Sequence, residues 1–269
     1  MTAVTLPPGA DPALGGRPFP LVRHSLSLAY RTILRIRRTP EQLFDVTFQP
    51  IIFIVLFVYL FGGAISGSTQ EYLQYVLPAL MVQTVLFSSM TIGVNLNTDI
   101  GKGVFDRFRS LPIPRSAPLV GAVLGDVVRY LVSIVVIIAF GYVIGFRVQT
   151  DAAQTVLAAL VLVVFSLCLC WVSVLIGMLV REPGGVQGIS FMLMFPLTFG
   201  SNMFVPVDTM PGWLQAWVHV NPVTHLTETV RSLMTGGPVA WPLAQTLLWA
   251  GAILAVFAPL AVRCYRRRA

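Results

Sequence analysis

Residues 98–118 read TDIGKGVFDRFRSLPIPRSAP and form the one sizeable charged segment between two long apolar runs in the middle of the chain. The apolar residues of this segment fall on one face of a short helix. The proline after Leu111 ends that helix, because a residue before proline is pushed out of the α region. A short amphipathic helix between two membrane spans can bind a partner outside the membrane. We therefore predict a coupling segment over 98–118, with the contact residues Val104, Phe105, Asp106, Arg107, Phe108, Arg109 and Leu111.

The composition excludes a soluble globular protein. The 269 residues are 56% hydrophobic and only 11% charged, whereas soluble domains carry about 25% charged residues. This length accommodates roughly six spans of about 20 residues with their connections. The net charge of +7 is explained by basic residues kept on the cytoplasmic side of a membrane. The Arg residues flank apolar runs and form no single solvated face, so we expect no nucleic-acid partner.

The N-terminal part divides into a tail and an amphipathic helix. Residues 1–20 are rich in Pro, Gly and Ala and lack periodicity, which predicts a disordered tail. Residues 21–38 place an apolar stripe beside a basic stripe, which favours a cytoplasmic helix lying in the plane of the lipid headgroups. Thr39-Pro40 begins the next helix, because Pro is favoured at the first helical position. A transmembrane domain is expected over 39–265.

The fold class predicted for this domain is an all-α integral membrane protein with six transmembrane helices. The apolar runs that define these helices cover 46–70, 72–98, 120–145, 152–180, 183–207 and 242–262, and only the third contains charged residues. The second run contains many polar residues, which indicates a face turned to protein or to a cavity and away from lipid. Gly200, Ser201 and Asn202 in the fifth run allow either close helix packing or unwinding beside a pathway.

Residues 206–241 differ from the other segments because prolines interrupt them repeatedly. A helix over 213–218 with Trp at headgroup depth, a turn at Asn221-Pro222 and a second helix over 224–234 are expected here. Together these predict an extracellular helical hairpin, re-entrant or interfacial, before the sixth span.

The basic residues determine the orientation. Fifteen of the 18 Lys and Arg residues fall on the side that carries both termini and the segment 98–118, whereas Arg147 and Arg231 fall on the other. The positive-inside rule therefore predicts that both termini and the coupling segment are cytoplasmic.

A few polar residues in or near the spans are candidates for moving parts. Asp126 and Arg129 lie three residues apart on neighbouring positions of one helix. They are either a locally neutralised pair that snorkels toward the headgroups or a hinge or gate contact. Asn202 and Pro222 are further candidate hinge or gate positions. In the interrupted segment, one helix face carries a polar ladder of His225, Glu228 and Arg231.

The sequence lacks the motifs of a self-powered protein or an enzyme. Gly101-Lys102-Gly103 has neither the spacing nor the hydroxyl residue of a phosphate-binding loop. Zinc-protease and serine-hydrolase motifs are absent, and the spans carry no chain of acidic and basic residues for proton-driven pumping. Energy is therefore expected from another chain, and we predict no enzyme activity and no cofactor in this one.

Three sequence segments carry a resemblance to a known family. The chain resembles ABC transporter permeases of the type-2 exporter class, and within them it is most similar to the daunorubicin/doxorubicin resistance permeases of actinobacteria. The segments are Arg37-Arg38-Thr39-Pro40, then residues 103–112 with Arg115, and finally Phe204-Val205-Pro206 followed by Met210-Pro211-Gly212-Trp213-Leu214-Gln215 and Asn221-Pro222.

This resemblance implies a set of partners and a location. It implies a separate ABC ATPase subunit that binds ATP and Mg²⁺, and a second permease, either a copy of this chain or a homologous one. It further implies that the segment 98–118 docks on the ATPase and that cargo leaves through the interface between the two permeases. The expected location is the bacterial inner membrane.

The function that follows is export of a hydrophobic or amphipathic, drug-like compound by the permease subunit of an ABC exporter. An exporter permease for a cell-envelope lipid or glycan is the main alternative. Nearly uncharged, aromatic spans favour the apolar cargo over a sugar chain. A membrane enzyme or a non-transporting scaffold is a lesser alternative, because no nucleophile or metal-ligand set converges in the sequence.

Overall fold

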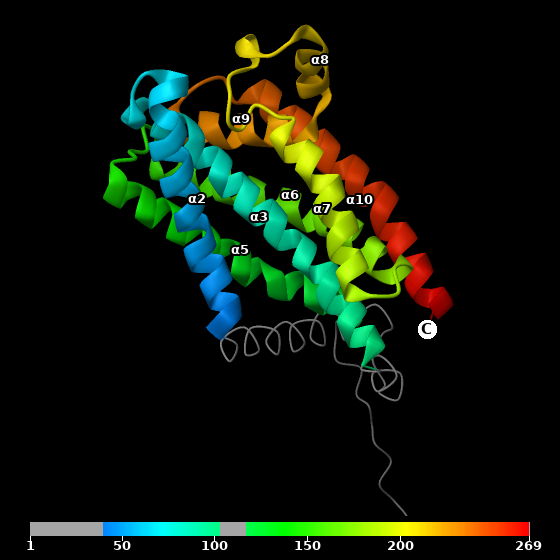
Figure 1. Cartoon of the computed structure of the whole chain (residues 1–269). Helices are drawn as coiled ribbons and strands as arrows, with labels where there is room; N and C mark the ends of the chain where they lie inside the picture. The colour runs from blue at the N-terminus through cyan, green and yellow to red at the C-terminus, as the bar shows by residue number, and fades with distance from the viewer. Residues whose placement is uncertain (1–39, 103–116, 269) are drawn as a thin grey trace, which may run out of the picture.

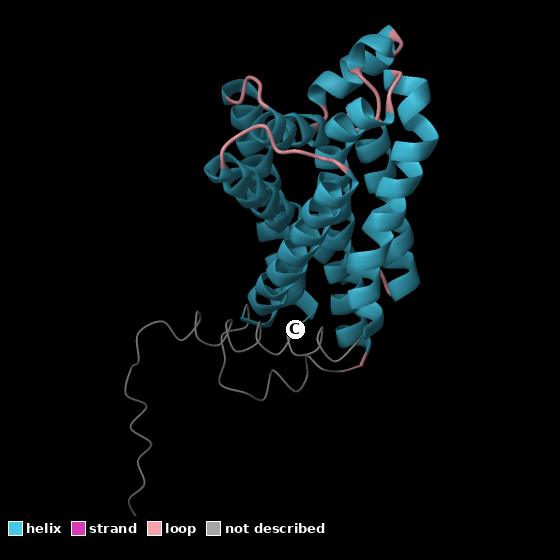
Figure 2. Cartoon of the chain, turned by 90° about the vertical axis from the view of Figure 1, so that its left-hand side faces the viewer, coloured by secondary structure: helices cyan, strands magenta, loops and turns pink. Residues whose placement is uncertain are grey.

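The computed structural model describes residues 40–102 and 117–268. These residues form helices and short connections, with no strand in either range (Figures 1 and 2). The helices in chain order are α2 (Pro40–Ser66), α3 (Thr69–Gly101), α5 (Ala117–Ile144), α6 (Ala152–Leu179), α7 (Pro183–Phe199), the 3₁₀ helix η1 (Val207–Thr209), α8 (Gly212–Val220), α9 (Pro222–Thr235) and α10 (Ala240–Arg268).

Helix α3 is the central element of the bundle. It packs against α2, α5, α6, α7 and α9, and in Figure 1 it crosses the molecule diagonally between α2 and α7. Its polar residues Gln83, Ser89 and Asn97 are buried with its apolar ones. The prediction that this run turns polar side chains toward protein is therefore confirmed. A 33-residue helix is about 50 Å long, which exceeds the thickness of the hydrocarbon core.

Five helices of the described part are long and apolar enough to cross a membrane. These stretches are Phe48–Ile65, Thr69–Gly101, Gly125–Ile144, Ala152–Leu179 and Ala240–Cys264. They correspond to five of the six predicted spans. The chain is thus an all-α, multi-pass membrane protein.

The fifth predicted span differs from the structure. Instead of running from residue 183 to 207, helix α7 ends at Phe199 after 17 residues, or about 26 Å, less than a hydrocarbon core of about 30 Å. The physical reason lies in the next residues. Gly200, Ser201 and Asn202 have low helix propensity, and neighbouring helices bind the backbone carbonyls that an extended helix would have used.

Helices α3 and α6 approach each other so closely that two glycines are required. A Cβ atom on Gly93 would collide with the backbone carbonyl of Ser173, and one on Gly177 would collide with the carbonyl of Gly93. Ser173 and Gly177 lie four residues apart on one face of α6, the small-residue spacing that lets membrane helices pack backbone to backbone. This contact fixes the crossing point of the two longest buried helices.

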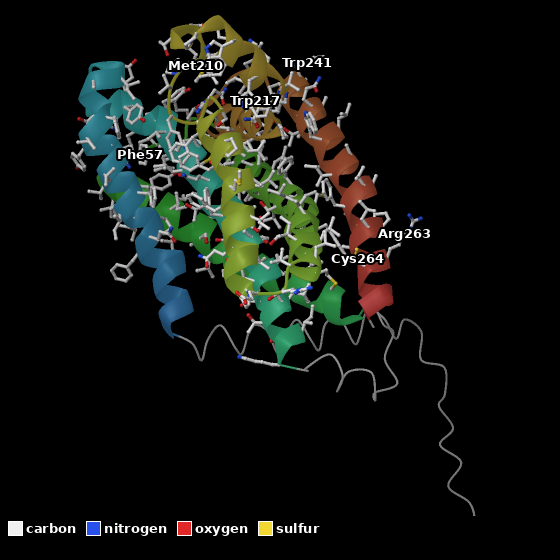
Figure 3. All side chains as sticks on the ribbon, turned by 45° about the vertical axis from the view of Figure 1, so that its right-hand side comes forward. Phe57, Met210, Trp217, Trp241, Arg263 and Cys264 are labelled. Carbon is white, nitrogen blue, oxygen red and sulfur yellow. The ribbon has the colours of Figure 1, made fainter. Side chains whose placement is uncertain are left out.

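The predicted pair of short helices before the last span is confirmed as two helices, α8 and α9. They lie together at the end of the bundle opposite the C-terminus (Figure 1). Figure 3 shows Trp217, Met210 and Trp241 at that end, and Arg263 and Cys264 at the other end of α10. Trp213, Trp217 and Trp241 are exposed, as expected for side chains at headgroup depth.

Several predictions concern residues outside the described ranges. The tail over 1–20, the amphipathic helix over 21–38 and all seven coupling residues from Val104 to Leu111 lie there. They stay predictions. The described helices α3 and α5 flank the coupling segment, because α3 ends at Gly101 and α5 begins at Ala117.

Candidate functional site

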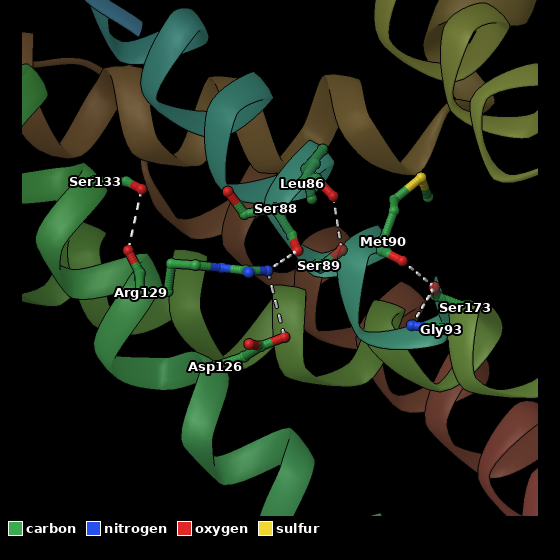
Figure 4. Close-up of polar contacts among 9 residues, drawn as sticks. All are labelled: Leu86, Ser88, Ser89, Met90, Gly93, Asp126, Arg129, Ser133 and Ser173. Carbon is green, nitrogen blue, oxygen red and sulfur yellow. Dashed lines mark hydrogen bonds and ion pairs between the residues drawn. The ribbon is translucent and has the colours of Figure 1, made fainter. Parts of the chain in front are cut away.

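Polar side chains and small residues join α3, α5 and α6 in a set of contacts that we call the polar seam, and Figure 4 shows its part around Arg129 and Ser173. The seam connects the cytoplasmic half of α3, as the predicted orientation assigns it, to α5 and α6. Buried polar groups in a membrane bundle need partners, because no water satisfies them. The polar seam consists of Ser88, Gly93 and Asn97 of α3, Asp126 and Arg129 of α5, and Ser173 and Gly177 of α6.

Asp126 and Arg129 form the α5 part of the polar seam. Their side chains are 3.6 Å apart, and the Arg129 Nη2 atom donates to the Ser88 carbonyl of α3 at 2.7 Å. Asp126 is 3% and Arg129 5% exposed. The guanidinium therefore points into the bundle, and the expectation that this pair snorkels to the headgroups is wrong. The buried pair is a link between α5 and α3.

Two further contacts tie α3 to α6. The Ser173 hydroxyl donates to the Met90 carbonyl at 2.6 Å and accepts from the Gly93 N–H at 3.1 Å. One turn further along, the Asn97 amide donates to the carbonyls of Gly177 at 2.9 Å and Val180 at 2.7 Å. Asn97 thereby satisfies carbonyls at the C-terminal end of α6, which have no partner within the helix.

A second group of side chains holds the turn 200–204 that follows α7. We call it the turn clamp, because its hydroxyl, amide and guanidinium groups donate to backbone carbonyls at the end of α7 and in the turn. The Tyr75 hydroxyl donates to the Asn202 carbonyl at 2.7 Å, and the Tyr72 hydroxyl donates to the Phe204 carbonyl at 3.2 Å. The turn clamp consists of Tyr72 and Tyr75 of α3, Asn221 just before α9, and Glu228 and Arg231 of α9.

Arg231 makes the largest number of contacts in the turn clamp. Its Nη2 atom donates to the carbonyls of Asn202 at 3.1 Å and Met203 at 3.4 Å, while its Nε atom donates to the Tyr75 carbonyl at 3.1 Å. Its Cζ atom lies 3.9 Å from the centroid of the Tyr75 ring, a cation–π contact. Burial lowers the pKa of Arg231, and Tyr75 and the Glu228 carboxylate act in the opposite direction.

Two members of the predicted polar ladder on α9, Glu228 and Arg231, contact Asn202. The Asn202 side-chain amide donates to the Glu228 carboxylate at 2.8 Å, and the Asn202 backbone carbonyl accepts from Arg231. His225, the third predicted member, is buried, and its Nδ1 atom has no hydrogen-bond partner among the described residues.

Asn221 and Pro222 build the corner between α8 and α9. Asn221 is the N-cap of α9 and accepts from the Val223 N–H at 2.9 Å, and Pro222 occupies the first helical position. The Asn221 amide also donates to the carbonyls of Leu197 at 2.8 Å and Gly200 at 2.9 Å. One side chain thus ends α7 and begins α9.

The four candidate hinge or gate residues do not form one cluster. Arg129, which pairs with Asp126, contacts α3 at Ser88, whereas Asn202 contacts α3 at Tyr75. These two positions lie about 20 Å apart along the helix axis. Asn202 and Pro222 belong to the same end, because Pro222 follows the residue that caps α7.

A row of aromatic rings connects α2 to α7 across the face of α3, and we call it the aromatic row. Phe57 of α2 stacks on Phe204 with the ring centroids 4.7 Å apart, and Phe204 stacks on Phe199 of α7 at 5.1 Å. From these rings the row continues along both helices and reaches α3. Its members are Phe53, Phe57, Phe61, Phe87, Phe191, Phe195, Phe199 and Phe204.

Most of the aromatic row is open to the surroundings of the chain. Phe191 is 54% exposed and Phe195 45%, whereas Phe204 at the joint is 7% exposed. The surface has no charged member and consists of flat rings in stacked or tilted contact, which suits a planar apolar molecule. This surface is absent from the residues predicted above, although both helices carry Phe at every fourth position, the spacing of one helix face.

The described residues of the site form contacts between helices and an exposed aromatic surface. No group of three or more His, Cys, Asp or Glu side chains that could hold a metal ion occurs within the described ranges. Its groups are buried hydrogen bonds between helices, a carbonyl-binding arginine and an open aromatic surface. These features define a multi-pass helical membrane protein whose inner helices are joined by polar contacts.

Comparison with known proteins gives the family. The family model "ABC-2 type transporter" matches residues 24–235. The chain is 42% identical over 247 residues to a daunorubicin resistance ABC transporter permease protein of Streptomyces coeruleorubidus, covering 92% of this chain and 87% of the relative. It is 31% identical over 223 residues to a doxorubicin resistance ABC transporter permease protein of Mycobacterium tuberculosis, covering 78% and 77%. The chain belongs to the ABC-2 type transporter family.

Proposed function

We propose that this chain is the membrane-spanning permease subunit of an ABC exporter that moves a hydrophobic or amphipathic, drug-like compound out of the cytoplasm or the inner leaflet. A separate ABC ATPase subunit hydrolyses ATP, and a second permease completes the assembly. Membership of the family and the names of the relatives support the exporter subunit. The observation that carries the cargo class is the uncharged, exposed aromatic row between α2 and α7.

The aromatic row is the path for the cargo in this proposal. A planar apolar compound gains dispersion and stacking energy on such rings, about 0.5–1.5 kcal/mol per aromatic pair beyond area burial. The rings on α7, from Phe191 to Phe199, follow one face of the second half of the helix. The compound can therefore move along α7 from ring to ring. The second permease covers this face, so that cargo passes between the two chains.

We infer six crossings, with α7 and the turn 200–204 together forming the fifth. The turn clamp supports this, because irregular backbone at membrane depth is tolerated only where protein satisfies its polar groups. Both termini and the segment 98–118 then lie in the cytoplasm of a bacterial inner membrane. The excess of Lys and Arg on that side supports the orientation.

In this proposal, movement of the ATPase is transmitted to the membrane helices through the polar seam. The ATPase binds the segment 98–118 through Phe105 and Phe108, and α3 and α5 flank that segment. Because Arg129 links α5 to Ser88 of α3, a push on the segment moves both helices together. In this scheme Asp126 and Arg129 form the hinge contact, and Asn202 and Pro222 belong to the gate at the opposite end.

Transport with and without the ATPase subunit tests this function. Inverted membrane vesicles containing the chain and its ATPase subunit should accumulate doxorubicin, used as the probe, only when ATP is present. Vesicles with the chain alone should accumulate none. Accumulation without the ATPase would contradict the proposal, and uptake of a labelled envelope lipid or glycan instead of the probe would favour the alternative cargo.

The coupling contact has its own test in the same vesicles. Replacing Phe105 and Phe108 by Ala should abolish ATP-driven accumulation of the probe, because the apolar face that fits the ATPase is lost. The chain should still insert into the membrane, as measured by its amount in washed membranes. Unchanged accumulation with normal assembly would refute the coupling role of these two residues.

A further inference from the structure

We propose that Arg231 is a positioning residue for cargo recognition, which acts by fixing the turn 200–204 and so holding Phe204 in the aromatic row. Arg231 itself does not touch the cargo. The inference rests on the proposed function, since it takes the aromatic row as the cargo path. It adds a residue on α9 to a path whose rings lie on α2, α3, α7 and the turn.

The first step is that Phe204 joins the two helical parts of the aromatic row. It lies outside both helices, yet its ring stacks on Phe57 of α2 at 4.7 Å and on Phe199 of α7 at 5.1 Å. The flanking rings are carried by regular helices, whose hydrogen bonds fix their positions. Phe204 follows a turn without such bonds, so the position of its ring depends on the contacts of residues 200–204.

The second step is that Arg231 holds the two residues immediately before Phe204. Its guanidinium donates to the carbonyls of Asn202 and Met203 at 3.1 and 3.4 Å. Tyr75 shares this task, because its hydroxyl donates to the Asn202 carbonyl at 2.7 Å and its ring lies against the guanidinium. Removing Arg231 leaves these carbonyls with fewer donors and lets the turn move.

The third step concerns the type of side chain. Arginine presents several donors in one rigid plane and stacks on aromatic rings, whereas the lysine ammonium is a point charge on a flexible stem. Arg231 uses the plane in both ways, donating from Nε and Nη2 and lying on Tyr75. Charge alone therefore does not replace it, and Arg231→Lys should behave as a partial loss.

A double-mutant cycle tests whether Arg231 acts through Phe204. In vesicles containing the chain with its ATPase subunit, doxorubicin transport is measured against probe concentration for the parent, Arg231→Gln, Phe204→Ala and the double variant. Each single variant should raise the half-saturating probe concentration about five- to tenfold, the loss of about 1–1.4 kcal/mol of binding, with the maximal rate retained. In the Phe204→Ala background, Arg231→Gln should have no further effect.

Arg147 provides a matched control. It also donates to backbone carbonyls, those of Tyr142 and Phe146, and its Cζ atom lies 5.6 Å from the Tyr142 ring centroid. It does not bind the turn 200–204. Arg147→Gln removes the same charge from the same end of the molecule and should leave the half-saturating concentration unchanged. Tyr75→Phe, which deletes one hydroxyl, is the milder variant if Arg231→Gln fails to assemble with the ATPase.

The outcomes separate the inference from the proposed function. If Phe204→Ala leaves the half-saturating concentration unchanged, the aromatic row is not the cargo path, and the positioning role falls with it, whereas ATP-driven accumulation by the parent still supports the exporter function. If Phe204→Ala raises it but Arg231→Gln and Tyr75→Phe do not, only the positioning role falls. Effects of Arg231→Gln and Phe204→Ala that multiply in the double variant would also overturn the positioning role, because the two residues would then act independently.

Discussion

At the scale of single residues, the molecule uses buried polar side chains as links between helices. Ser173, Asn97 and Arg129 each donate to a backbone carbonyl of another helix. Such bonds are specific, since each joins a fixed pair of positions. A buried charge is a different case, because it is costly unless its partner is present. The Asp126–Arg129 pair therefore stabilises the fold only as long as both members are in place.

Replacing Arg129 alone should destabilise the protein more than replacing the pair. Arg129→Met leaves the Asp126 carboxylate buried without its counter-charge, which costs about 3–5 kcal/mol. The double variant Asp126→Leu, Arg129→Met removes both charges and should recover most of that loss. The measurement is the midpoint of thermal unfolding in detergent. A double variant no more stable than Arg129→Met would show that the ion pair is not the source of the effect.

The sequence indicates which polar residues of the spans are candidates for helix contacts more readily than it indicates their partners. The three-residue spacing of Asp126 and Arg129 indicated a pair. The contact with Ser88 could not be predicted, because it depends on how α5 crosses α3. The place of Asn202 in an apolar run likewise indicated a candidate residue. Its hydrogen-bond partners Tyr75 and Arg231 could not be predicted, because they are far apart in sequence.

At the scale of elements, small residues and helix ends determine the arrangement. Helix α6 lies against α3 because Gly93 and Gly177 leave room for backbone contact. Helix α7 ends early because the Asn221 amide donates to the carbonyls of Leu197 and Gly200, and the rest of the turn clamp binds carbonyls of the following turn. Hydropathy could predict the apolar run over 183–207, but it contains no information about such tertiary partners, so the end of the helix was predicted too late.

A methyl group at Gly93 should disrupt the crossing of α3 and α6. Gly93→Ala places a Cβ atom onto the Ser173 backbone, and such overpacking costs about 1–3 kcal/mol. Gly251→Ala on α10 is the matched control, because nothing lies within 4 Å of its Cβ position. The control should be neutral or slightly stabilising, since Ala has the higher helix propensity. Equal unfolding midpoints for both variants would mean that the backbones do not approach this closely.

At the scale of the whole molecule, two groups of contacts lie at opposite parts of α3. The polar seam joins α3 to α5 near the middle of α3, at Ser88, and to α6 toward the end that flanks the coupling segment, at Asn97. The turn clamp joins α3 to α9 and to the end of α7. Helix α3 therefore contacts both the polar seam, which we propose transmits movement from the ATPase, and the turn clamp, which we propose belongs to the gate. The aromatic row crosses the same helix at Phe87.

The composition, the charge distribution and the length of the apolar runs were sufficient to predict an all-α membrane protein. The two helical parts of the aromatic row could have been predicted, because Phe53, Phe57 and Phe61 lie four residues apart, as do the rings on α7. Its continuity could not be predicted, since it depends on Phe204 lying between two helices that are distant in sequence.

The central claim is that apolar cargo moves along the aromatic row under power from the ATPase, and one transport measurement tests it most directly. ATP-driven doxorubicin accumulation is compared in vesicles containing the parent chain, Phe57→Leu, Phe199→Leu, or Phe257→Leu as a control on α10. The account predicts that the half-saturating probe concentration rises several-fold for the two row variants, because each loses about 0.5–1.5 kcal/mol of stacking, and that the control equals the parent. Identical values for all four proteins would contradict it.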